Sequence, residues 1–180
     1  KTSQSPKPSR EAGSASTSMS AKIFAPTGQE AIRSVAVSPD GKYSVSGGKN
    51  SLKLWDIATG REIRTFKGDS DATYAAFTAD YSVAFSSDGR YVLSGSVYHH
   101  AKIWDVSTGK EIRTFYGPTD GNGTVAFSPD GKYALFTGSR DNYLGLWDVE
   151  SGNGIAALRG HTDRVHTVTF SPDSKYALSA

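Results

Sequence analysis

Short runs of alternating hydrophobic and polar residues predict β-strands along most of the chain, in groups of four. In the most regular group we expect strands over residues 124–127, 133–137, 143–147 and 155–158, because successive side chains of a strand point to opposite faces of its sheet. Segments rich in Gly, Asp and Ser separate these runs, as hairpin turns require. No window has the apolar spacing of an amphipathic helix. The pattern therefore predicts an all-β protein with almost no helix.

The third strand of each group carries large hydrophobic residues on both faces. In the first group, Leu52 and Leu54 share one face, whereas Trp55 shares the other with Ser51 and Lys53. A sheet that packs on one side alone shows a cleaner alternation than this. We therefore expect each sheet to be covered on both sides, as it is when similar sheets stack face to face.

Two motifs recur at regular intervals along the chain. A Ser-x-Asp-Gly-Lys/Arg-Tyr turn motif, with Ser in place of Gly in its last copy, begins at Ser38, Ser86, Ser128 and Ser171. A Trp-Asp pair occurs at 55–56, 104–105 and 147–148. The serines are 48, 42 and 43 residues apart, and a period in the low forties with four strands per unit is the signature of a propeller blade. The repeat units span approximately 27–68, 69–117 and 118–160, with a partial unit at 161–180.

These motifs resemble the WD-repeat (WD40-type) β-propeller family over residues 21–180. The resemblance implies blades of four-stranded antiparallel sheet, each with a buried hydrogen-bonded set of His, Ser or Thr, Asp and Trp. No unit keeps the whole set: Pro118 stands at the His position of the third unit, for example. The residues that match the family's structural positions are Trp55, Trp104, Trp147, Asp141 and His161.

About three and a half blades are present, whereas propellers close with four to eight. We therefore expect an incomplete propeller, which is either a fragment of a longer array or half of a ring that two chains complete by self-association. The end of the chain within a strand, at Ala180, favours the fragment. The second unit holds about seven extra residues, so that residues 74–77 and 82–85 compete for its first strand. We prefer 82–85, because it adjoins the turn motif directly.

Composition and charge narrow the function classes. The chain has 180 residues, no cysteine and a net charge of +2, all of it within the Ser- and Pro-rich residues 1–20. We interpret residues 1–20 as a disordered tail or linker, since they lack the apolar residues that offset chain entropy. Residues 21–180 carry equal numbers of acidic and basic groups, which argues against a nucleic-acid partner. No segment is apolar enough to span a membrane.

Candidate chemistry is sparse, and we expect no catalytic residue, metal site or cofactor. His99 and His100 lack the further ligands that a zinc site needs. The sequence favours a non-catalytic scaffold, placed in the cytoplasm, that binds a protein or peptide through exposed loops on one face. The alternative is a regulatory or sensing array of a multidomain enzyme whose kinase, protease or NTPase part lies outside this chain. Matched by position to the family's docking face, the candidate partner-binding residues are Arg33, Tyr98, His99, Arg140, Arg164 and His166.

Overall fold

The computed structural model describes residues 31–48, 51–66, 82–95, 100–116, 123–137 and 142–180. Within these ranges the chain forms β-strands joined by turns and contains no helix. The strands are β1 (Ile32–Val37), β2 (Tyr43–Gly48), β3 (Ser51–Asp56), β4 (Glu62–Phe66), β5 (Val83–Phe85), β6 (Tyr91–Gly95), β7 (His100–Asp105), β8 (Glu111–Tyr116), β9 (Val125–Phe127), β10 (Tyr133–Thr137), β11 (Tyr143–Asp148), β12 (Gly154–Arg159), β13 (Val168–Phe170) and β14 (Ala177–Ser179).

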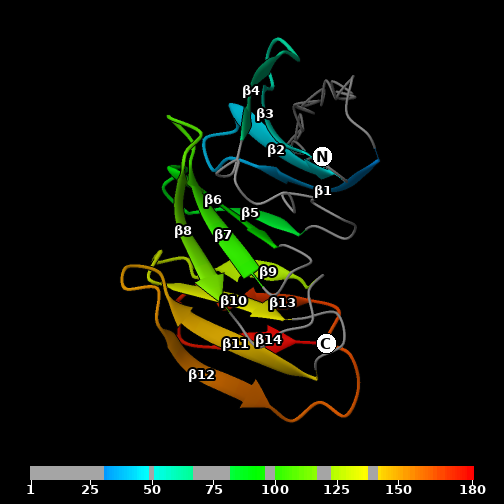
Figure 1. Cartoon of the computed structure of the whole chain (residues 1–180), viewed down its shortest axis with the longest axis vertical. Helices are drawn as coiled ribbons and strands as arrows, with labels where there is room; N and C mark the ends of the chain where they lie inside the picture. Colours follow the sequence, from blue (N-terminus) through cyan, green and yellow to red (C-terminus); the bar gives the residue numbers. More distant parts are fainter. Residues whose placement is uncertain (1–30, 49–50, 67–81, 96–99, 117–122, 138–141) are drawn as a thin grey trace, which may run out of the picture.

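The strands form three four-stranded antiparallel sheets and one two-stranded sheet, in the order of the chain. β1–β4, β5–β8 and β9–β12 are the three full blades, and β13 and β14 are the start of a fourth. The sheets follow one another as a row, with β1, β5, β9 and β13 in contact along one side (Figure 1). The preference for residues 82–85 as the first strand of the second unit is confirmed by β5, whereas residues 74–77 lie outside the described ranges.

Each blade is held by two turns whose side chains bond their own backbone. In the first turn of blade one, Ser38 Oγ donates to Asp40 at 2.7 Å and accepts from the backbone N–H of Tyr43 at 2.9 Å. Gly41 closes this turn at a φ of 70°, a conformation that costs glycine little. The turn between β3 and β4 repeats the principle, because Asp56 accepts from both the N–H and the hydroxyl of Thr59. The same bonds recur in the later blades.

The hydrophobic core lies between neighbouring blades. Each interface buries one face of each of the two sheets that meet there. Leu52 and Leu54 of the first blade are buried together with Trp104 of the second. Phe66 meets Trp104 edge-on, with ring centroids 5.9 Å apart. The tryptophan face of one blade thus packs on the leucine face of the blade before it. Since neighbouring sheets share this layer, the prediction that both faces are covered is confirmed at the interfaces between described blades.

The first two blades hold their tryptophans in the same way. The Nε1 of Trp55 donates to Ser46 at 2.8 Å, and that of Trp104 donates to Ser94 at 2.9 Å. Both indoles are buried. A buried N–H that keeps a partner avoids the desolvation penalty of an unmade hydrogen bond.

An ion pair accompanies this arrangement in the same two blades. Lys53 and Glu62 are 2.7 Å apart, and the Lys53 ammonium lies 5.6 Å from the centroid of the tryptophan ring of its own blade. Lys102 and Glu111 repeat the pair in the second blade. In the third blade, Gly145 stands at the lysine position and the pair is lost.

The third blade also treats its tryptophan differently. Phe136 stands where the other blades have Ser46 and Ser94, and Trp147 stacks on it with ring centroids 5.2 Å apart. The Trp147 Nε1 is buried without a hydrogen-bond partner among the described residues. Gly145 permits this placement, since a Cβ there would lie 2.6 Å from that nitrogen. Trp147 therefore keeps its place by stacking on Phe136 and packing against Phe115 of the second blade, with ring centroids 5.8 Å apart.

The partial fourth blade retains one bond of the buried set that the family resemblance implied. His161 Nε2 lies 2.7 Å from the hydroxyl of Ser179. Ser179 occupies the position of Ser46 and Ser94 in the repeat. Asp141, the candidate aspartate of the third unit, lies outside the described residues.

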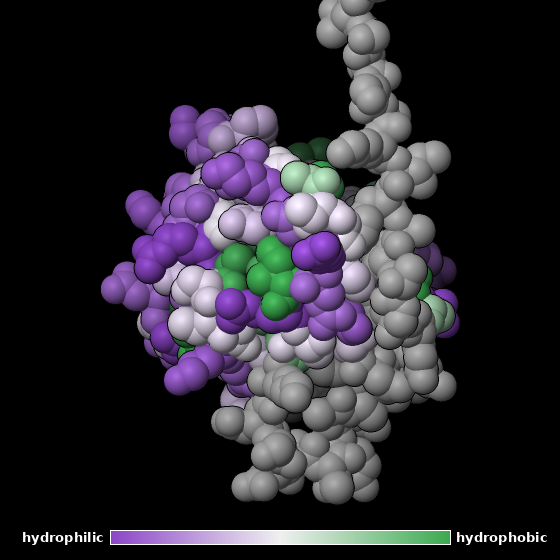
Figure 2. Space-filling view, turned by 90° about the horizontal axis from the view of Figure 1, so that it is seen from above, coloured by the Kyte–Doolittle hydropathy of each residue, from purple (hydrophilic) through white to green (hydrophobic). Residues whose placement is uncertain are grey.

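The row of blades is not closed, so both of its ends expose hydrophobic side chains. Val35 and Val37 of β1 are 65% and 59% exposed, and Tyr176 and Leu178 in the fourth blade are 68% and 61% exposed. Figure 2 shows a small hydrophobic patch, surrounded by hydrophilic side chains, at the end formed by the first blade. An unclosed arc of propeller blades is what the sequence predicted.

The two kinds of tryptophan environment lead to a stability prediction. We expect Trp104→Phe to lower the free energy of unfolding by about 1–2 kcal/mol more than Trp147→Phe, because Trp104→Phe leaves the buried Ser94 hydroxyl without its partner. Trp147→Phe removes an N–H that has no partner among the described residues. Urea unfolding followed by circular dichroism measures both losses. Equal losses would contradict the difference that we describe.

Candidate functional site

The candidate partner-binding residues divide into described and undescribed ones. Arg33, near the start of β1, and Arg164 and His166, just before β13, are exposed. Arg33 and His166 lie at the same step of the repeat, five residues before the serine of the turn motif, and Arg164 lies two residues earlier. All three are at the entrance to the first strand of a blade, and therefore at one end of the sheets. The others, Tyr98, His99 and Arg140, lie outside the described residues. The role of this end in binding stays a prediction.

At the opposite end of the sheets, where the turn motifs lie, a groove runs between each pair of full blades. The first groove, between blades one and two, has a volume of about 420 Å³ and is lined by Tyr43, Leu54, Ile63, Arg64, Gly89, Arg90, Asp105, Val106 and Ser107. The second groove, between blades two and three, has a volume of about 440 Å³ and is lined by Tyr91, Ile103, Ile112, Arg113, Asp130, Gly131, Lys132, Asp148, Val149 and Glu150. Most lining positions correspond in the repeat, so the two grooves are versions of one structure.

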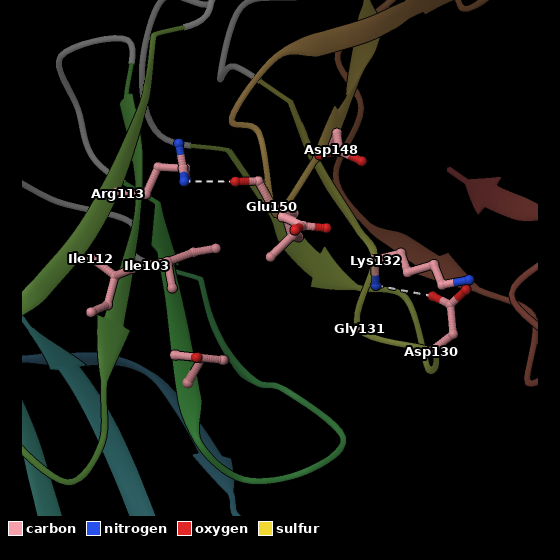
Figure 3. Close-up of a pocket in the computed structure, with 10 residues that line it drawn as sticks. Ile103, Ile112, Arg113, Asp130, Gly131, Lys132, Asp148 and Glu150 are labelled. Carbon is pink, nitrogen blue, oxygen red and sulfur yellow. Dashed lines mark hydrogen bonds between the residues drawn. The ribbon is translucent and has the colours of Figure 1, made fainter.

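An arginine from the outermost strand of one blade reaches the hairpin of the next. In the second groove, Arg113 extends from β8 and donates to the backbone carbonyl of Glu150 at 2.7 Å (Figure 3). It also donates to the backbone carbonyl of Ser151 at 3.0 Å. Gly152 lets the arginine approach, since a Cβ there would lie 2.7 Å from a guanidinium nitrogen. In the first groove Arg64 approaches Gly109 in the same manner. This contact joins the rims of neighbouring blades.

These grooves were not predicted from the sequence, although the sequence contains a signal for them. The segment Glu-Ile-Arg-Thr-Phe occurs twice, at 62–66 and 111–115. Ile63 and Arg64 of the first copy therefore correspond to Ile112 and Arg113 of the second. The third blade has Ala156 at the arginine position. An identical run of five residues on a half-exposed outer strand marks a contact that recurs between blades.

The carboxylates of the turn motifs are held in their ionised form by local hydrogen bonds. Hydrogen bonds lower the pKa of Asp40 below its usual value: the largest effect comes from the Ser38 hydroxyl and the next from the backbone N–H of Lys42. The serine hydroxyls of the same motif lower the pKa of Asp130 and of Asp173. In the hairpin after β3, the hydroxyl and N–H of Thr59 lower the pKa of Asp56. These carboxylates therefore serve the turns as hydrogen-bond acceptors.

The described residues contain no group of three or more His, Cys, Asp or Glu side chains that could hold a metal ion. They also contain no helix long and apolar enough to cross a membrane. What the described surface offers is a pair of grooves and a set of exposed strand entrances, which are features suited to contact with another molecule.

Comparison with known proteins identifies the repeat and a short stretch of further likeness. The WD40 family description, WD domain, G-beta repeat, matches residues 19–56, 60–105, 109–148 and 152–180. The chain is 54% identical over 39 residues to the ribosome biogenesis protein BOP1 homolog of Drosophila melanogaster, covering 21% of the chain and 5% of that protein. It is 39% identical over 71 residues to the BOP1 homolog of Caenorhabditis elegans, covering 37% of the chain and 10% of that protein. The chain thus spans at most about a tenth of these relatives.

The lowered aspartate pKa values predict how stability depends on pH. A carboxylate whose pKa is lower in the folded state stabilises the fold above its unfolded pKa of about 3.9, and this contribution is lost as the pH falls through the folded value. We therefore expect the free energy of unfolding to change little from pH 7 to about 5 and to fall below about pH 4.

The double variant Asp40→Asn/Asp130→Asn tests the cause, because asparagine can still accept the serine bond but does not titrate. Its free energy of unfolding, measured by urea at a series of pH values, should fall less steeply below about pH 4 than that of the wild type. Parallel curves for the two proteins would show that these turns do not cause the acid sensitivity.

Proposed function

Because the chain belongs to the WD domain, G-beta repeat family, we propose that it is a non-catalytic scaffold that binds protein or peptide partners. The single observation that supports this most is the repetition of one rigid blade, with its polar groups committed to turns and its large hydrophobic groups to the interfaces between blades. Such a framework presents its exposed segments in fixed positions, which lowers the entropy that binding costs.

The electrostatic state of the described blades fits the same proposal. The turn aspartates accept hydrogen bonds from their own motifs, so their carboxylates are occupied by structural contacts. A general acid or base instead needs a pKa moved toward neutral pH, whereas these pKa values are lowered. The likeness to ribosome biogenesis proteins extends over one or two repeats, so it supports a shared blade.

We place one partner surface at the strand entrances that hold Arg33, Arg164 and His166. Arginine and histidine there are exposed and project from backbone that the blades hold in place. Arginine is one of the residue types that contribute most to binding at protein interfaces. The first strands of neighbouring blades lie in contact, so these side chains project from the same end of the row of blades.

The test compares the proteins captured by the wild-type chain with those captured by Arg33→Ala/Arg164→Ala/His166→Ala. We expect at least one partner to fall by about fivefold or more in the triple variant, since loss of one important contact costs about 1 kcal/mol or more. Quantitative mass spectrometry after affinity capture measures the change.

The matched control is Lys42→Ala/Lys175→Ala, which removes exposed cations in the turn motifs at the other end of the sheets. It should capture the same proteins as the wild type. If the wild type and the triple variant capture the same amount of every protein, the strand entrances are not a partner surface. If the wild type captures no more protein than an unfolded chain does, the scaffold proposal itself is contradicted.

A further inference from the structure

The two grooves share a shape but differ in how their arginine is used. In the second groove, two nitrogens of Arg113 are bonded to the carbonyls of Glu150 and Ser151. In the first groove, the Nε of Arg64 is buried and has no hydrogen-bond partner within the described ranges. Arg64 is therefore not fixed by carbonyl bonds of the kind that hold Arg113 to the neighbouring hairpin.

The two grooves also differ in charge. The first groove is lined by Arg64 and Arg90 against a single carboxylate, Asp105. That carboxylate already accepts bonds from Ser107 and Thr108. The ionisable lining of the second groove has an excess of carboxylates and comprises Arg113, Lys132, Asp130, Asp148 and Glu150. Among the lining residues, cations exceed carboxylates by one in the first groove and carboxylates exceed cations by one in the second, while Asp88, the counterpart of Asp130, lies next to Arg90 outside the lining of the first groove.

One substitution in the repeat accounts for part of this contrast. Ser107 in the hairpin of the second blade corresponds to Glu150 in the hairpin of the third. Arg90 corresponds to Lys132 in the turn motif. Arginine presents a planar fork that pairs with a carboxylate through two bonds, whereas lysine is a point charge. The first groove thus has two such forks where the second has one fork and one ammonium.

We propose that the first groove binds an acidic peptide segment of a protein partner, a proposal that rests on the scaffold function above. A partner carboxylate would pair with the positive charge that Arg64 and Arg90 bring to the first groove, since charge-assisted bonds of this kind are among the stronger ones. The Arg90 guanidinium also lies 5.4 Å from the centroid of the Tyr91 ring. A neighbouring apolar side chain would pack on Ile63, which is 42% exposed at the rim. A segment that alternates acidic and apolar residues fits this combination of positive charge and an exposed hydrophobic side chain.

The probe is a short fluorescein-labelled peptide of alternating glutamate and leucine, compared with its glutamine counterpart, and binding to the full chain is measured by fluorescence anisotropy. We expect the glutamate peptide to bind and the glutamine peptide to bind about fivefold or more weakly. Ser107→Glu gives the first groove the carboxylate of the second and should weaken the glutamate peptide by about fivefold or more. Ser107→Glu removes the bond from Ser107 to Asp105, but Asp105 keeps its two bonds from Thr108. The third blade has Glu150 at the same position, so we expect this variant to keep the fold, which circular dichroism checks.

Arg90→Gln and Lys132→Gln form the matched pair, because they remove one positive charge from equivalent positions of the two grooves. Arg90→Gln should weaken the glutamate peptide, and Lys132→Gln should leave its affinity unchanged. Equal weakening by both variants, or equal binding of the two peptides, would overturn the proposal.

The outcomes separate this inference from the scaffold proposal. If the chain captures partners that do not depend on Ser107 or Arg90, and the glutamate peptide does not bind, the groove proposal fails and the scaffold stands. If the glutamate peptide binds as predicted but the chain captures no protein, the scaffold proposal fails. The claim that the acidic segment belongs to a protein partner then fails with it, and only the affinity of the groove for acidic peptides stands.

Discussion

The structure depends on the packing of the tryptophan face of one blade against the leucine face of the blade before it. Trp104 projects from β7 of the second blade and is fully buried against the first blade, where it packs with Leu52, Leu54 and Phe66. A single four-stranded sheet could not bury both of its faces alone, so each blade obtains part of its core from its neighbour. Turns, hydrogen bonds and ion pairs refine a framework that this layer holds together.

The same packing explains where recognition can occur. Sheets that meet face to face use up their surfaces, and their turns and rims are what remains exposed. At one end lie the strand entrances with Arg33 and Arg164, and at the other lie the two grooves, where Arg113 joins the rims of neighbouring blades. The repeat copies a shape from blade to blade, while single substitutions such as Ser107 against Glu150 change its charge. A family built this way can keep its architecture and vary its partners.

Most of the fold could be predicted from the sequence, because strand alternation and turn chemistry act over a few residues. The strand 133–137 and the choice of 82–85 were correct for this reason. The stacking of Trp147 on Phe136 could not be predicted, since it depends on the absence of a side chain at Gly145 and on the contact of Trp147 with Phe115 of the second blade. The grooves were missed because their walls come from different blades. Four of the candidate residues lie outside the described ranges: Tyr98, His99, Arg140 and Asp141.

The most direct test of blade-to-blade packing is the coupling free energy between Phe66 and Trp104, which belong to different blades and whose rings meet edge-on. A double-mutant cycle of Phe66→Leu and Trp104→Phe, followed by urea unfolding, measures it. Direct packing predicts a coupling of about 0.5–1.5 kcal/mol. Two losses that add without coupling would contradict the account, because they would mean that the two blades do not share this layer.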